Sequence, residues 1–145
     1  MQHVFLILPS RSLIIESFAS EIDLPDYIAF KTEQISHPDF DSGFDVLSDL
    51  RWAEFAFPPR EVHKLVDFFK ENVDLEAHRK GCLLTFEPMQ TAYSMLFKKH
   101  TEGKGVSWKV CTTLIESLAW LNDPLTIEEL EVTLAELKEQ RERKI

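Results

Sequence analysis

The chain has little glycine and little cysteine, four and two residues in 145, and no apolar stretch long enough to span a membrane. Neither GxGxxG nor a Walker pattern occurs, so the chain lacks a glycine-rich loop whose backbone N–H groups could bind the phosphates of a nucleotide. HExxH, CxxC and GxSxG are absent as well, and the five histidines share no metal-ligand spacing. We therefore expect no catalytic residue, no bound metal and no cofactor.

Basic residues are also fewer than acidic ones, and the net charge is −9. Nucleic-acid binding is disfavoured, because phosphate contacts need a basic surface. Cys82 and Cys111 both fall within apolar, strand-like runs, which favours reduced, buried thiols over a disulfide. The first residues, MQHVFLILPSRS, lack the basic start and small-residue cleavage site of a signal peptide. We expect a cytoplasmic protein without stable membrane insertion.

What the chain does contain is enough apolar sequence for one core: 44% hydrophobic residues, eleven of them phenylalanine. We expect a single domain over residues 1–145, with a core over 1–123 and a C-terminal amphipathic helix over 124–145. Apolar runs and turn residues predict the elements along the chain. These are a hairpin over 4–15, a helix over 23–35, a strand over 44–50, a helix over 59–73, a strand over 82–86, a helix from 88, a strand over 106–111, a short helix from 112 or 113 and a last helix from 126.

This order predicts an α/β fold: a mixed, mostly parallel sheet with an N-terminal antiparallel hairpin at its edge, helices on both faces and an extra C-terminal helix. Apolar residues at helical spacing predict which side of each helix faces the core. These residues are Leu24, Ile28 and Ile35; Val62, Leu65, Val66, Phe69 and Val73; Met89, Ala92, Tyr93, Leu96 and Phe97; Leu114, Leu118 and Leu121; and Ile127, Leu130, Leu134 and Leu137. Thr126 with Glu129 predicts a capping box for the last helix.

Polar residues follow two of the predicted strands, at the edge of the sheet where open α/β folds bind ligands and partners. The candidate ligand or partner site comprises Asp49, Arg51, Thr85, Glu87, Gln90 and Thr91. One interpretation is a small polar site, or a hydroxyl at a helix start that accepts phosphate. The other is structural: Asp49 and Arg51 satisfy loop amides and Glu87 caps its helix.

Four segments carry a resemblance to a known family: LIIESFASEI, FDVLSDLRWAEFAFPPREVHKLVDFFKEN, KGCLLTFEPMQTAYSMLFKKH and VCTTLIESLAWLN. Residues 14–122, about three-quarters of the chain, resemble the SpoIIAA-like branch of the STAS fold, also described as STAS/SEC14-like proteins. The last segment, a strand followed by a short helix closing on Ala-Trp-Leu-Asn, is the most telling. These are patterns of core and turn residues, so they bear on the fold more than on function.

The resemblance implies a mixed sheet flanked by helices, no enzymatic activity and a role in protein interaction. Phospho-switched members of the family carry a serine at the corresponding helix start, where this chain has Phe57-Pro58-Pro59-Arg60 and no hydroxyl. We therefore expect a non-enzymatic STAS-like interaction or regulatory module without that switch, with an unknown protein partner or a homodimer. The alternative, implied by SEC14-like relatives, is a carrier or sensor of a small apolar ligand or lipid. An enzyme that uses Asp49, Arg51 or Glu87 ranks last, because nothing pairs a nucleophile with a base.

Overall fold

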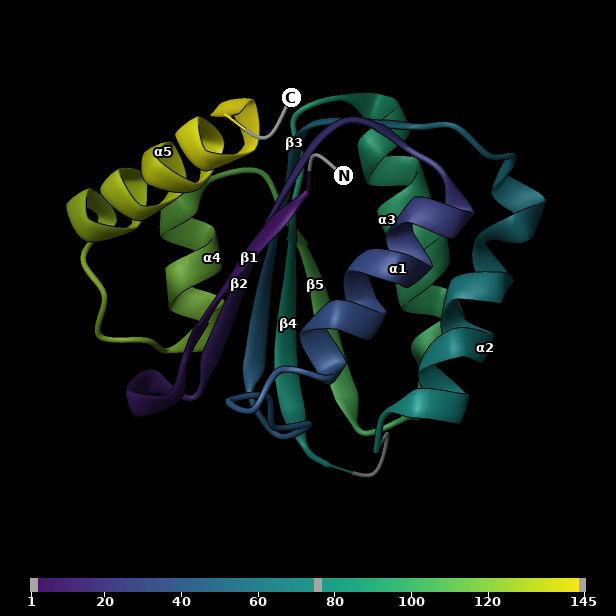
Figure 1. Ribbon diagram of the computed structural model, residues 1–145, viewed down its shortest axis with the longest axis horizontal. Helices are drawn as coiled ribbons and strands as arrows, with labels where there is room; N and C mark the ends of the chain where they lie inside the picture. The colour runs from purple at the N-terminus through teal and green to yellow at the C-terminus, as the bar shows by residue number, and fades with distance from the viewer. Residues whose placement is uncertain (1–2, 75–76, 144–145) are drawn as a thin grey trace.

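Five strands form one sheet that lies between two layers of helices (Figure 1). The computed structural model describes residues 3–74 and 77–143. The first three α-helices along the chain cover one face of the sheet, and the two that follow them cover the other. The α/β class, the mixed sheet and the helices on both faces are as the sequence predicts.

The strands stand in the sheet in the order in which they occur in the chain, β1-β2-β3-β4-β5. Strands β1 and β2 pair antiparallel, and every later neighbour pairs parallel, which confirms the N-terminal hairpin edge. Their bounds are β1 Val4–Leu8, β2 Leu13–Ile22, β3 Asp45–Phe55, β4 Arg79–Leu84 and β5 Val106–Cys111.

The helices begin where the capping residues of the sequence place them. Asp23 caps α1 and Thr113 caps α4 through side-chain oxygens that accept backbone N–H groups, and Thr126 and Glu129 form the predicted reciprocal pair at the start of α5. The bounds are α1 Leu24–Ile35, α2 Val62–Asn72, α3 Pro88–Thr101, α4 Leu114–Leu121 and α5 Ile127–Arg143, with 3-10 turns at Pro9–Arg11 and Pro59–Glu61.

Two strands run further than their apolar sequences indicate. Strand β2 continues past Ile15 to Ile22, and β3 continues past Leu50 to Phe55. The predicted ends were wrong because polar residues follow in both strands, Glu16 and Ser17 in β2 and Arg51 in β3. Glu16 and Ser17 are nevertheless buried in the structure. Polarity therefore marks a site within the sheet here, and not the end of a strand.

The predicted core-facing sides of α1 and α3 were also partly wrong. In α3, Met89 and Ala92 are exposed, and the buried positions beside Tyr93 and Phe97 belong to Gln90 and Ser94. In α1, the fully buried residues are Phe30, Lys31 and Gln34, whereas Leu24, Ile28 and Ile35 are only half-buried. Both helices thus turn polar side chains toward the interior.

The two faces of the sheet have different cores. The core under α4 and α5 is aliphatic and includes leucines of α5 and both cysteines, and here Cys82 donates a hydrogen bond to Ser117 at 3.2 Å. Both thiols are free and buried. The core under α1, α2 and α3 is rich in aromatic rings, and it is this core that holds the buried polar residues of α1.

Candidate functional site

The six residues of the predicted site do gather, at the carboxyl end of β4, the neighbouring middle of β3 and the start of α3, but they chiefly bond one another and the backbone. Asp49 accepts two hydrogen bonds from the Arg51 guanidinium, at 2.8 and 2.9 Å, and one from the Arg51 N–H. The hydroxyls of Thr85 and Thr91 lie 2.9 Å apart. Glu87 is the N-cap residue of α3.

Gln90 is the most heavily bonded member of this group. Its side-chain oxygen accepts the N–H groups of Phe86 and Glu87, and its nitrogen donates to the carbonyls of Arg51 and Ala53, both at 3.0 Å. Strand β4 pairs with β3 only as far as Asp49, so these carbonyls lie on a stretch of β3 beyond that pairing. Gln90 therefore bonds the backbone groups that β4 leaves unpaired on β3, which is a structural role.

Exposed apolar side chains surround Arg51 on the outside of this group. Strand β3 has one more residue than β2 between the pairs Ser17–Asp49 and Ala19–Trp52, and this bulge lies at Leu50 and Arg51. The Arg51 guanidinium lies within cation–π range of Trp52 and Phe86, and Lys138 of α5 lies 4.4 Å from the Trp52 ring. We call Trp52, Phe86 and Met89, which are 45, 56 and 61% exposed, the aromatic patch.

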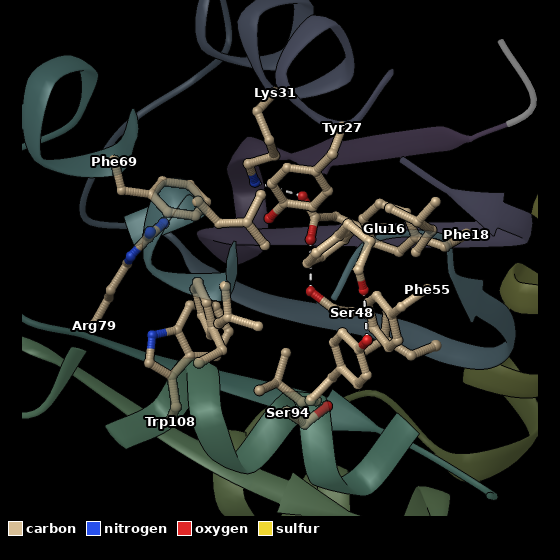
Figure 2. Close-up of a pocket in the computed structure, with 18 residues that line it drawn as sticks. Glu16, Phe18, Tyr27, Lys31, Ser48, Phe55, Phe69, Arg79, Ser94 and Trp108 are labelled. Carbon is tan, nitrogen blue, oxygen red and sulfur yellow. Dashed lines mark hydrogen bonds and ion pairs between the residues drawn. The ribbon is translucent and has the colours of Figure 1, made fainter. Parts of the chain in front are cut away.

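A different site lies on the other side of the sheet, inside the aromatic core (Figure 2). Helices α1, α2 and α3 and the sheet enclose a cavity of about 50 Å³ that is lined mainly by apolar and aromatic side chains, among them Phe18, Phe55, Phe69 and Trp108. That volume has room for a few water molecules. Natural cores are packed without such gaps as a rule, so the space needs an explanation.

One wall of the cavity carries a buried carboxylate with all its bonds made inside the protein. Glu16 of β2 accepts hydrogen bonds from Lys31 at 2.5 Å and Gln34 at 2.8 Å on one oxygen, and from Ser48 at 2.5 Å on the other. Lys31 also donates to Gln34 at 2.7 Å. We call these four residues the Glu16 network.

The ionisation of the Glu16 network follows from these contacts. Burial alone would raise the pKa of Glu16, but the charge of Lys31 and the three donors hold it below its ordinary value. Burial lowers the pKa of Lys31, and the attraction of Glu16 opposes that shift. We therefore treat the two side chains as a buried ion pair. Removing one member of this pair would leave the other as an uncompensated buried charge.

Two further polar groups line the same cavity without a partner. The Ser94 hydroxyl of α3 and the Nε atom of Arg79, the first residue of β4, have no hydrogen-bond partner among residues 3–74 and 77–143. Both side chains are buried, and buried polar atoms are almost always bonded. An ion pair, two unsatisfied groups and an unfilled volume therefore occur together in one place.

Sequence reasoning missed the cavity and the Glu16 network. Glu16 lies within the segment LIIESFASEI, where the apolar neighbours hide it, and the predicted core-facing side of α1 did not include Lys31 and Gln34. A signal was present in α1, because Tyr27, Phe30, Lys31 and Gln34 share one side at helical spacing. Polar residues at the spacing of an aromatic stripe indicate a polar site within the core.

Comparison with protein-family models, curated proteins and solved structures finds no match to this chain. Within the described ranges, no cluster of three histidine, cysteine or acidic side chains has the arrangement of a metal site. None of the helices described is long and apolar enough to cross a membrane.

Proposed function

We propose that the protein binds a small, largely apolar molecule in the cavity between its helices and the sheet, as a carrier or sensor. The single observation that supports this is the aromatic cavity that contains the unpartnered Ser94 and Arg79 groups. Binding pockets are typically apolar with a few convergent polar groups, whereas a core selected for stability has neither voids nor orphaned donors. SEC14-like proteins, which the sequence resembles, bind apolar molecules in the corresponding place.

A ligand larger than a few water molecules must displace side chains from the cavity. Tyr27 and Phe55 are the natural candidates, because both line the cavity and are only half-buried. Phe55 stacks on Tyr93 at 4.5 Å, and Tyr27 meets Phe69 edge-on across the gap between α1 and α2. An apolar ligand would replace these ring contacts with contacts of its own.

The proposal is one of binding without catalysis. Glu16 is engaged at both oxygens and is a poor candidate for a general base. Interaction with the neighbouring Cys111 thiol and burial raise the pKa of the Cys82 thiol well above its ordinary range, which disfavours the nucleophilic thiolate. Glu16 is therefore a fixed part of the cavity wall, whereas Cys82 lies in the core under α4 and α5 and does not line the cavity.

The test is a titration with 1-octanol, a neutral apolar probe, followed by amide chemical shifts of the labelled protein. We expect the shifts to centre on the residues that line the cavity. In a Ser94→Leu variant the larger side chain occupies the space, so binding should weaken about tenfold or more. Met95→Leu, on the exposed side of the same helix, serves as the matched control and should bind like the wild type.

The cavity proposal is wrong if octanol causes no saturable shifts at the cavity, or if Ser94→Leu binds as tightly as the control. Thermal denaturation of both variants would be measured alongside. Ser94→Leu is expected to fold, because it removes an unsatisfied hydroxyl and fills a void.

The aromatic patch supports a second candidate, the STAS-like interaction module, in which the partner is a second copy of this chain. Arg51 and Lys138 border the patch, and Glu54 and Glu87 line the adjoining surface groove of about 470 Å³. An apolar centre with both signs of charge beside it is complementary to itself across a twofold axis, the commonest symmetry of homodimers. Exposed aromatic residues are also the usual anchors of such interfaces.

Sedimentation equilibrium tests this second candidate. We expect a dimer whose dissociation constant rises at least about tenfold in Trp52→Ser, because a central aromatic anchor is lost. Ile115→Ser, which removes an exposed apolar side chain from α4, should leave the dimer unchanged. A wild-type protein that stays monomeric throughout the micromolar range would exclude self-association through this patch.

A further inference from the structure

Arg79 carries a buried positive charge that no described side chain balances at contact distance. The residue is only 8% exposed, and its Nε atom has no hydrogen-bond partner within the described ranges. Burial lowers the pKa of Arg79, with Glu16 and Asp45 acting on it from a distance in the opposite direction. An arginine remains charged in such a place, so the guanidinium is a buried cation in need of an anion.

Neither neighbouring carboxylate forms an ion pair with Arg79 within the described ranges. Glu16 accepts three hydrogen bonds within its own network, and Asp45 accepts the Lys80 N–H at 2.8 Å. Figure 2 shows the Arg79 guanidinium beside Phe69, apart from the dashed bonds of the Glu16 network. The charged side chains that line the cavity are thus two cations, Lys31 and Arg79, and one carboxylate, Glu16. Their net charge is +1.

A basic entrance leads toward this charge. Lys70, His78 and Lys104, together with Asp74, line a surface groove of about 750 Å³ next to the start of β4. Lys104 also borders a small gap of about 10 Å³, whose other walls include Arg79, Phe69, Phe97 and Trp108. All four of these side chains line the cavity as well, so the gap adjoins the cavity, and Lys104 lines both the gap and the groove. In a chain with a net charge of −9, basic residues at such a mouth favour the approach of an anion.

We infer that the ligand is an amphiphilic monocarboxylate, whose carboxylate pairs with Arg79 and whose apolar part occupies the aromatic cavity. A single surplus charge matches a monoanion better than a phosphate, which carries up to two. The planar guanidinium can donate two parallel hydrogen bonds to a carboxylate, a geometry that lysine lacks. The inference rests on the proposed function, since it concerns the same cavity and adds the class of ligand.

The experiment compares octanoate with 1-octanol, which share a chain and differ in the head group. Both are titrated, with chemical shifts as the readout, into the wild type, Arg79→Met and Arg79→Lys. In the wild type we expect octanoate to bind at least about tenfold more tightly than octanol, the effect of a buried charged hydrogen bond. Arg79→Met should abolish that preference and keep octanol binding, and Arg79→Lys should retain only part of it.

The outcomes separate the two proposals. Failure of both probes to reach the cavity would overturn the proposed function. Equal affinity for both probes in the wild type would overturn the carboxylate inference and leave the apolar cavity in place. A preference for octanoate that persists in Arg79→Met would assign the anion to Lys70 or Lys104 at the entrance, and Arg79 would lose its role. Thermal denaturation should show Arg79→Met to be no less stable than the wild type, because an unpaired buried charge is removed.

Discussion

Replacing Lys31 with methionine should destabilise the protein by about 3–5 kcal/mol, the cost of leaving a buried charge without its partner. The substitution removes the ammonium that bonds Glu16 at 2.5 Å and lies 5.3 Å from the Phe69 ring, while the methionine stem keeps most of the packing. Chemical denaturation with urea, followed by circular dichroism, measures the loss.

The double variant Glu16→Leu with Lys31→Met is the matched control. It removes both charges at similar volume, and replacing a buried ion pair in this way is often neutral or stabilising. We therefore expect its free energy of unfolding to return to the wild-type value or to exceed it. Such a result would mean that the Glu16 network is kept for something other than stability.

The pH dependence gives an independent check with opposite signs in the two proteins. In the wild type the pKa of Glu16 is held low. The ionised Glu16 therefore contributes to the free energy of unfolding at neutral pH, and this contribution is lost as the pH falls below about 4.3. In Lys31→Met, burial without the cation raises the folded-state pKa above the unfolded value. The variant should therefore lose stability as the pH rises from about 4.3. The difference in free energy of unfolding between the wild type and the variant should widen over the same range. A gap under about 1 kcal/mol that stays constant with pH would contradict a buried ion pair.

The second large effect is expected at Gly81, where the sheet leaves no room for a side chain. Gly81 of β4 pairs with Trp108 of β5, and a Cβ atom at Gly81 would lie 2.2 Å from the Trp108 ring. The ring is buried and held edge-on to Phe97 at 5.1 Å, so it cannot swing away. We expect Gly81→Ala to lower the free energy of unfolding by about 3 kcal/mol or more, at the upper end for overpacking.

Two comparisons isolate the clash. Gly43→Ala places its Cβ 3.2 Å from the Asp41 carboxylate on an exposed loop and should cost less than about 1 kcal/mol. In a Trp108→Leu background the ring is gone, so Gly81→Ala should cost much less than in the wild type, and a double-mutant cycle measures the difference. If the effects of the two substitutions are additive, Gly81 is needed for its backbone conformation and not to make room for the Trp108 ring.

The features of the fold that could be predicted from the sequence were those specified locally. Thr126 and Glu129 mark the start of α5, and Pro88 after Glu87 marks the start of α3, because caps and proline act within one turn. The parallel arrangement followed from alternating strands and helices. The true length of β2 could not be predicted, because Glu16 is compatible with a buried strand only once Lys31, Gln34 and Ser48 are in place.

The candidate sites show the same limit more sharply. Asp49, Arg51 and Gln90 were predicted to lie together at the carboxyl ends of two parallel strands. They do lie together, but Asp49 and Arg51 lie within β3, beside the end of β4. That their side chains would bond one another was one of two interpretations, and only three-dimensional geometry separates them. The cavity was not predicted, because Arg79, Lys31 and Ser94 come from three distant segments and share no spacing in the sequence.

The order of the strands has a consequence for how the protein is made. The sheet is laid down strand by strand in the direction of synthesis, yet α5, which follows all five of these strands along the chain, is the helix that packs on β1 and β2. Until then, apolar residues of the first hairpin such as Val4, Leu13 and Ile15 have no cover on that face. The nascent chain therefore exposes an apolar surface until α5 has been synthesised, and chaperones that shield hydrophobic segments should engage it early and release it when α5 docks.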